Sequence, residues 1–176
     1  YNIAKQTSDE ELKGSVNSEL GILYAYLGRS KQSMSYYQQA YQHYKRANKT
    51  ILSLNSLVNI AISHLDSKEY EQAISTYKII IKESKGIGQN EIMYNTYSGL
   101  SWANLKKESS NLEASYQYLL IAKQYVDSIE RRDIDLQFAT DEAFVLYELD
   151  RLDEALVSIA KIEKILSAQM PLGRLK

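Results

Sequence analysis

A pattern that recurs about every 40 residues constrains the fold of this chain more than any other feature of its sequence. Each copy has a small residue, a large side chain four positions later, and Ala or Ile three positions after that. The small residues, which are 40, 41 and 41 positions apart, are Ser33, Ala73, Ala114 and Ala155. The large residues are Tyr37, Tyr77, Tyr118 and Ile159. Since offsets of four and seven share one face of a helix, the pattern predicts four copies of one amphipathic helix.

A second apolar segment precedes each of these helices, which predicts that every repeat unit is a helical hairpin. The first helix has small residues where a close crossing with the second helix needs little side-chain volume. These residues are Gly21, Ala61, Ser101 and Ala143. We expect Gly28 to end the first helix of the first hairpin. Ser110 with Glu113 is expected to form a capping box, and Asp150 is expected to cap the last helix.

The pattern resembles the tetratricopeptide repeat, whose two-helix unit has a Leu-Gly pair, an aromatic residue, a Gly turn, a small Ala, a large aromatic residue and another Ala. The matching residues of the first hairpin are Leu20, Gly21, Tyr24, Gly28, Ser33, Tyr37 and Ala40. The resemblance covers about residues 14 to 165, although the period is longer than the 34 residues of the common repeat. It implies an all-α, right-handed superhelical solenoid of antiparallel helical hairpins, with about four repeats and partial flanking repeats.

The repeats predict one solenoid domain, residues 1–176, with internal boundaries that follow the repeat units. The end of a preceding repeat is expected at 1–13, repeats one to four at 14–49, 50–90, 91–131 and 132–169, and the start of a following repeat at 170–176. The preceding repeat is inferred because residues 1–12 align without a gap to residues 41–52. We therefore expect the chain to be a fragment of a longer protein.

Composition and charge argue against several classes of function. Lys and Arg (21) balance Asp and Glu (22), and no apolar run has the length of a membrane span, so we expect no nucleic-acid contact and no membrane contact from this segment. Without Cys, the chain has no zinc-thiolate site and no Cys nucleophile. The neighbouring acids Asp141 and Glu142 point in different directions on a helix and are expected to be solvated. We expect no cofactor, no metal and no catalytic constellation, and hence not an enzyme.

The first helices carry the candidate ligand site, because in the resembled family they line a concave groove. An apolar strip at these positions comprises Ile22, Ile62, Trp102 and Phe144, with Leu65, Leu105 and Tyr147 one turn further on. Seven residues before the strip, amides recur on the same face at Asn55, Asn95 and Gln137. Such a ladder can hold the backbone of an extended peptide or protein segment, since each amide has a donor and an acceptor. The alternative is that the strip packs one first helix against the next and the amides face water.

Charge is distributed unevenly along the chain. Residues 12–65 contain six basic residues and one acid, whereas residues 127–154 contain three arginines and ten acids. Opposite charge at the two ends favours steering of a charged partner or self-association through the solenoid ends.

The sequence thus favours a non-catalytic scaffold that binds a peptide or protein. Residues 131–156, together with residues 170–176, resemble the sensory repeat regions that precede GGDEF domains in bacterial diguanylate cyclases. That resemblance implies a sensory or interaction role in a bacterial signalling protein, in the periplasm or the cytoplasm. A repeat region of a peptide-responsive transcription regulator and an assembly adaptor are the alternatives.

Overall fold

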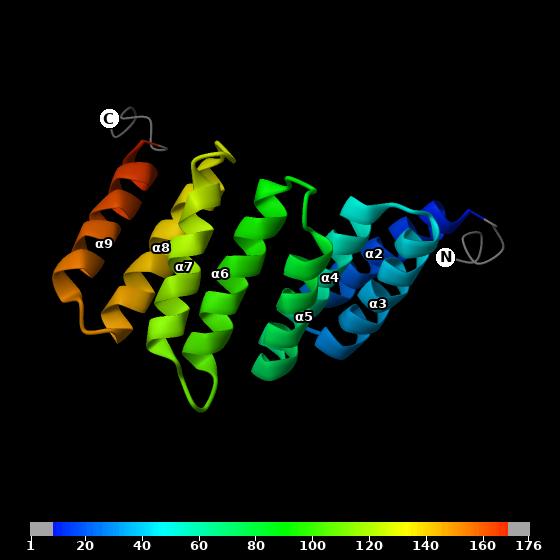
Figure 1. Ribbon diagram of the computed structural model, residues 1–176, viewed down its shortest axis with the longest axis horizontal. Helices are drawn as coiled ribbons and strands as arrows, with labels where there is room; N and C mark the ends of the chain where they lie inside the picture. Colours follow the sequence, from blue (N-terminus) through cyan, green and yellow to red (C-terminus); the bar gives the residue numbers. More distant parts are fainter. Residues whose placement is uncertain (1–8, 169–176) are drawn as a thin grey trace, which may run out of the picture.

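The computed structural model describes residues 9–168, which form eight helices and no strand (Figure 1). The helices are α2 (Glu10–Tyr26), α3 (Ser30–Arg46), α4 (Thr50–Asp66), α5 (Tyr70–Glu83), α6 (Asn90–Lys106), α7 (Leu112–Val126), α8 (Arg132–Glu148) and α9 (Leu152–Ser167). The predicted start of a following repeat, 170–176, lies outside the described residues, as do residues 1–8 of the predicted preceding repeat.

Consecutive helices pack against each other, and the resulting hairpins stack along the long axis of the molecule. Among the first helices of the hairpins, α4 also contacts α6, and α6 contacts α8. Figure 1 shows the hairpins in chain order, with α2 and α9 at opposite ends. The predicted all-α solenoid of helical hairpins is therefore confirmed. Within the described range, no helix is both long enough and apolar enough to cross a lipid bilayer.

The spacing of the helices corrects the predicted repeat length. The first helices begin at Glu10, Thr50, Asn90 and Arg132, and the second helices begin at Ser30, Tyr70, Leu112 and Leu152. The period is thus 40 residues, except where it spans the turn 107–111, across which it is 42. That turn has five residues, whereas the turns 27–29, 67–69 and 149–151 have three. The two extra residues shift the third hairpin relative to the predicted alignment.

This shift places Ser115, rather than Ala114, at the helix crossing of the third hairpin. Ser115 is fully buried, and its hydroxyl lies 3.0 Å from the hydroxyl of Ser101 on α6. In the same way, Leu119 occupies the core position that was assigned to Tyr118, and Tyr118 packs half-buried at the edge of the core. Ala114 and Ser115 are both small, so size alone does not distinguish the two registers.

The other predicted packing residues are buried or half-buried, except Ile159 at the large position of the last hairpin, which is exposed. Gly21, Ser33, Tyr37, Ala61, Ala73, Tyr77, Ser101 and Ala155 are buried, and Ala143 is half-buried. In the first hairpin, the Ser33 hydroxyl donates a hydrogen bond of 2.8 Å to the backbone carbonyl of Gly21. At Gly99 on α6, a side chain would overlap the ring of Tyr77, so this close approach requires glycine.

The turns use partly different residues from those predicted. Gly28 ends α2 as expected, with a φ of 67° and a hydrogen bond from the Arg29 N–H to the Tyr24 carbonyl. The cap of α7 is Asn111, whose side chain accepts from the Ala114 N–H, so the predicted capping box at Ser110 is wrong. Asp150 is not the cap of α9 either, because it occupies the turn with a φ of 58° and Arg151 precedes the helix.

The start of the first hairpin also differs from its predicted boundary. Helix α2 begins at Glu10, four residues before residue 14. Asp9 caps the helix there, because its carboxylate accepts a hydrogen bond of 3.1 Å from the Leu12 N–H.

Candidate functional site

The first helices α4, α6 and α8 border a cavity of about 510 Å³, which we call the groove cavity. Five of the ten predicted groove residues line it: Ile62, Leu65, Asn95, Trp102 and Gln137. The remaining lining residues are Tyr77 from α5, Tyr94, Ser98 and Gly99 from α6, and Thr140 and Asp141 from α8. The structure therefore brings two of the three predicted amides together with part of the predicted apolar strip.

The other five predicted groove residues lie elsewhere. Phe144 contacts Trp102 at the edge of the cavity, and Asn55 is exposed on α4. Ile22 packs half-buried against the N-terminal part of the core, whereas Leu105 is buried in the C-terminal part. Tyr147 is exposed near the end of α8. Part of the predicted strip thus packs in the core. The alternative interpretation of the sequence expected such packing for the whole strip.

An aromatic pair stands at one edge of the groove cavity. The ring centres of Trp102 and Phe144 are 5.3 Å apart, and the rings are tilted by 56°. The Lys106 ammonium lies 5.0 Å from the Trp102 ring centre and 4.3 Å from that of Phe144. The electron-rich faces of these rings already accommodate a cation within the chain.

Asp141 is the only charged side chain among the described residues that line the groove cavity. The Ser98 hydroxyl donates a hydrogen bond of 2.7 Å to one carboxylate oxygen, and the Gln137 amide donates one of 2.9 Å to the other. Burial raises the pKa of Asp141, although both hydrogen bonds oppose this shift. Asp141 is half-buried rather than solvated, so the expectation from the sequence was wrong for this residue.

Tyr94 contributes a buried hydroxyl group that has no hydrogen-bond partner among the described residues. The side chain is 2% exposed and lines the groove cavity. Burial raises the pKa of Tyr94 and the nearby Asp141 carboxylate raises it further, whereas the Ser98 hydroxyl next to it lowers it. A buried polar group without a partner is costly, so this hydroxyl favours a ligand that offers it a hydrogen bond.

Sequence reasoning missed both Tyr94 and Asp141, but one signal for Tyr94 was available. Tyr94 occupies the repeat position that holds Leu54 in α4 and Leu136 in α8, so a polar group stands at an otherwise apolar position. No comparable signal marks Asp141, because its two partners are identified only by the packing of α6 against α8.

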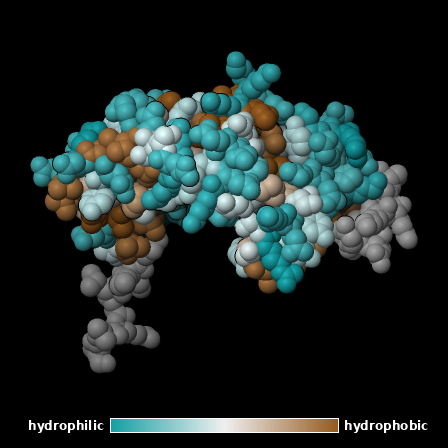
Figure 2. Space-filling view, turned by 90° about the horizontal axis from the view of Figure 1, so that it is seen from below, coloured by the Kyte–Doolittle hydropathy of each residue, from teal (hydrophilic) through white to brown (hydrophobic). Residues whose placement is uncertain are grey.

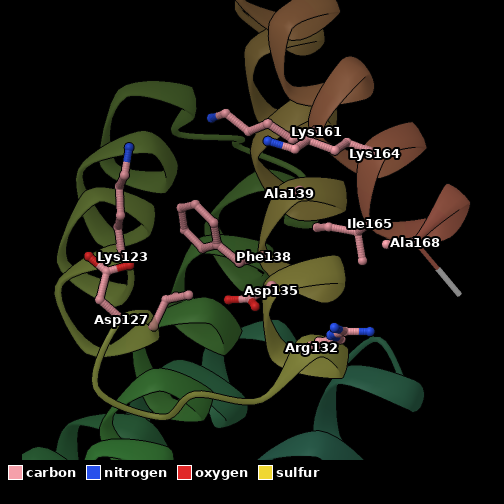
Figure 3. Close-up of a pocket in the computed structure, with 11 residues that line it drawn as sticks. Lys123, Asp127, Arg132, Asp135, Phe138, Ala139, Lys161, Lys164, Ile165 and Ala168 are labelled. Atoms are coloured by element: carbon pink, nitrogen blue, oxygen red, sulfur yellow. The ribbon is translucent and has the colours of Figure 1, made fainter.

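A second cavity, of about 460 Å³, is bordered by α7, α8 and α9, and we call it the wedge cavity. Its apolar lining comprises Val126, Phe138, Ala139, Ile165 and Ala168. Figure 3 shows Lys123 from α7 on one side of Phe138, and Lys161 and Lys164 from α9 on the other. Asp127, Arg132 and Asp135 complete the charged lining.

Two of these lysines are held by Glu142, which is only 8% exposed. Its carboxylate accepts hydrogen bonds of 2.6 Å from the Ser158 hydroxyl and 2.8 Å from the Lys161 ammonium, and lies 3.8 Å from the Lys123 ammonium. Burial alone raises the pKa of Glu142, but these bonds and the two positive charges outweigh burial and lower the pKa. The expectation that Glu142 is solvated was therefore wrong. The negative charge of Glu142 is paired with Lys161 and Lys123.

The last hairpin also presents an apolar surface that no other described residues cover. Its lining residues, apart from Thr140, are all apolar or aromatic: Ala143, Phe144, Tyr147, Leu152, Ala155, Leu156, Ile159 and Ile162. Leu156 is 61% exposed, whereas Ile74 at the same position of the second hairpin is 7% exposed. Figure 2 shows apolar side chains at the end of the molecule where α8 and α9 lie. In the inner hairpins, the next hairpin covers these positions.

Across residues 9–168, no group of three or more His, Asp or Glu side chains is arranged to hold a metal ion. The two histidines bond to single glutamates, His43 to Glu10 and His64 to Glu69, at 2.8 Å and 2.7 Å.

Comparison with known proteins gives a family match over part of the chain. Residues 12–81 match the family model described as tetratricopeptide repeat. A comparison with curated proteins found no match.

Several solved structures share the fold. The apo form of RapI superposes with a TM-score of 0.83 and 16% sequence identity, over 96% of this chain and 61% of that one. Aspartyl phosphate phosphatase F from Bacillus subtilis superposes with a TM-score of 0.81 and 22% identity, over 93% of this chain and 42% of that one. BtubC from P. vanneervenii gives a TM-score of 0.76 and 14% identity, over 97% of this chain and 71% of that one.

These likenesses establish the fold. The chain spans less than two thirds of the length of the first two proteins, and identities this low carry over no activity, including that of the phosphatase. The family match and the shared fold support tetratricopeptide-type repeats, which form scaffolds for protein interaction. The family match and the shared fold are consistent with the non-catalytic scaffold that the sequence predicted.

Proposed function

We propose that this tetratricopeptide-type scaffold binds an extended segment of a partner peptide or protein in the groove cavity. The observation that carries the proposal is the convergence of Asn95, Trp102 and Gln137 from two neighbouring first helices on one cavity. Amides selected by repeat spacing alone meet there beside an aromatic side chain that apolar ligand groups can contact.

The state of the amides supports an extended peptide as ligand. The Asn95 side chain makes no hydrogen bond within the described part of the chain, so that its donor and its acceptor are both open. Gln137 donates to Asp141, and a carboxamide oxygen can still accept a bond from a peptide N–H. One backbone amide plane of a peptide needs one donor and one acceptor, which each of these side chains supplies.

The finer form of the proposal places the scaffold in a bacterial signalling protein, upstream of a GGDEF domain. The support for it is the sequence resemblance of residues 131–156, which contain the Gln137 and Asp141 wall of the groove cavity. A peptide-responsive transcription regulator uses the same kind of scaffold, and the sequence of the parent gene distinguishes the two.

The test starts from selection of heptapeptides from a displayed random library against the immobilised chain. A selected peptide is then titrated into the protein while the emission of Trp102, the only tryptophan, is recorded. We expect saturable binding with a dissociation constant of about 1 mM or tighter. Asn95→Ala and Gln137→Ala should each weaken binding several-fold, whereas Gln117→Ala on the exposed surface of α7 should leave it unchanged. Failure to enrich any peptide, or equal effects of all three variants, contradicts the proposal.

Self-association in an assembly adaptor is a second candidate, favoured by the charge asymmetry and by the uncovered apolar surface of the last hairpin. Sedimentation velocity across a range of protein concentrations and salt concentrations tests it. Assembly that grows with concentration and weakens with salt supports this candidate, and a monomer at every condition contradicts it.

A further inference from the structure

Among the described residues, only Asp141 contributes a charge to the groove cavity, and the hydrogen-bond partners of its carboxylate are neutral. Asp141 receives hydrogen bonds from Ser98 and Gln137, and no Lys or Arg among the described residues lines the cavity. A carboxylate offers about four lone-pair sites, and two of these are occupied. The site therefore has acceptor capacity that the fold does not use.

A second polar group belongs to a side chain that lines the same cavity. The Tyr94 hydroxyl is buried and has no partner among the described residues, and a hydroxyl oxygen can accept as well as donate. The open acceptor sites of the Asp141 carboxylate and the Tyr94 hydroxyl match a ligand group with several N–H donors and a positive charge.

The surroundings of the cavity also favour a cation. The segment 127–154, which includes α8, has ten acids and three arginines. Two of these arginines are already paired, Arg131 with Glu91 and Asp133, and Arg151 with Glu154. The ring faces of Trp102 and Phe144 at the cavity edge are already covered by the Lys106 ammonium, so the acids of segment 127–154, and not these rings, favour a cation.

We infer that the groove cavity selects a peptide through a basic side chain, Arg or Lys, that bonds to the Asp141 carboxylate and reaches the Tyr94 hydroxyl. This inference rests on the proposed function and specifies the chemistry of its ligand. The peptide backbone lies along Asn95 and Gln137, while the stem of the basic side chain contacts Ile62, Leu65 and Trp102. Arg suits this site best, because its planar guanidinium presents several donors at fixed angles.

The test uses the heptapeptides selected by display, and it has two parts. First, the selected sequences should share Arg or Lys at one position. Second, replacing that residue by citrulline, a neutral analogue of Arg, should weaken binding at least about tenfold, the scale of one charge-assisted hydrogen bond. Free N-acetyl-arginine amide should bind far more weakly than the peptide, since it lacks the backbone that the amides hold.

Variants of the protein then assign the effect to the site. Asp141→Asn keeps the size of the side chain and should abolish the preference for Arg over citrulline. The matched control is Glu142→Gln, which changes the adjacent acid on the other side of α8 and should keep the preference. Tyr94→Phe should weaken binding of the Arg peptide about two- to fivefold without unfolding the chain. Far-UV circular dichroism of each variant verifies that the solenoid is intact.

The outcomes separate this inference from the proposed function. Selected peptides without a shared basic residue, or an Asp141→Asn variant that still prefers Arg over citrulline, overturn the inference but leave peptide binding in place. A library that yields no peptide overturns both. N-acetyl-arginine amide that binds as tightly as the peptide shows a site for small cations and overturns the assignment to a peptide.

Discussion

Asp141 and Glu142 are neighbours in the sequence of α8, but their side chains point to different faces of that helix and have different partners. Asp141 lines the groove cavity and accepts hydrogen bonds only from the neutral groups of Ser98 and Gln137. Glu142 is next to the wedge cavity, and its carboxylate contacts Ser158 and the cavity residues Lys161 and Lys123. The pKa of Asp141 is raised and the pKa of Glu142 is lowered.

The difference separates a carboxylate that stabilises the fold from one that is available to a ligand. Opposite charges inside the chain compensate for the burial of Glu142, and its removal leaves lysines without their partner. No cation of the described chain compensates for the burial of Asp141, so an external cation gains more from this site. One helix can thus anchor the last hairpin with one face and recognise a ligand with the other.

The largest expected effect concerns the helix register on which both faces depend. Ser115→Leu inserts a large side chain at a fully buried crossing and removes the contact with Ser101, so it should lower the free energy of unfolding by about 3 kcal/mol. Ala114→Leu, one residue earlier and half-buried, should cost less than about 1 kcal/mol. Urea unfolding measures both. If Ala114→Leu lowers the free energy of unfolding more than Ser115→Leu does, then Ala114 and not Ser115 lies at the helix crossing.

Glu142→Gln should give the next largest effect. It removes a charge from a buried site that bonds two lysines, and we expect a loss of about 2 kcal/mol in the free energy of unfolding at neutral pH. The loss is limited because the Lys161 side chain is 48% exposed and can be hydrated. The matched variant Asp141→Asn should change stability by less than about 0.5 kcal/mol, since it keeps the size and removes an uncompensated charge. The reverse order would abolish the distinction between the two acids.

Ser158→Ala should cost about 1 kcal/mol, because the Ser158 hydroxyl donates a buried hydrogen bond of 2.6 Å to Glu142. Ser98→Ala removes the corresponding donor to Asp141 and should cost less, because Asp141 keeps its bond from Gln137 and is only half-buried. Thermal unfolding followed by circular dichroism compares the two. Equal losses would mean that Asp141 is as structural as Glu142.

Acid should affect the two carboxylates in opposite directions. The folded-state pKa of Glu142 is lowered, so its contribution is complete above the ordinary Glu pKa of about 4.3 and is lost as pH falls through the lowered pKa. The folded-state pKa of Asp141 is raised, so the cost of its charge at neutral pH disappears as pH falls through the raised pKa. Between pH 7 and acid pH, the wild type should lose its advantage over Glu142→Gln and gain stability relative to Asp141→Asn. Urea unfolding at several pH values tests this, and parallel trends contradict it.

The smallest effect is expected for Tyr94→Phe in the absence of ligand. The hydroxyl has no partner among the described residues, so its removal should leave the free energy of unfolding unchanged or raise it by about 0.5 kcal/mol. A loss of more than about 1 kcal/mol would show that the hydroxyl is already satisfied, and it would remove one support for a ligand at this position.

The fold was predictable from sequence because the core positions recur at helical offsets in every hairpin. The register of the third hairpin was not, since Ala114 and Ser115 both satisfy the small-residue pattern and only the length of the turn 107–111 decides between them. Glu142 stands at a position that holds Ile60 and Leu100 in the preceding hairpins, but its charge led to the expectation that it is solvated, because its buried partners come from α7 and α9 and cannot be read from the repeat.

The candidate site was only partly predictable. Repeat spacing found Asn95 and Gln137, which occupy equivalent points on α6 and α8, and Trp102, which is equivalent to Ile62 on α4. It did not find Asp141, whose partner Ser98 is 43 residues away in sequence and meets it only through the packing of α6 against α8. Helical periodicity identifies the face of each helix but not the contacts between faces.

Amide chemical shifts can locate the ligand, which we expect to bind on the face of α8 that carries Asp141. A selected heptapeptide is titrated into ¹⁵N-labelled protein, and perturbed amides are mapped onto the helices. The account predicts perturbations along α4, α6 and α8 around Asn95, Trp102 and Asp141, with the indole N–H of Trp102 among the most affected signals. Perturbations concentrated on α7 and α9 around Lys123 and Lys161 would place the site in the wedge cavity and contradict the account.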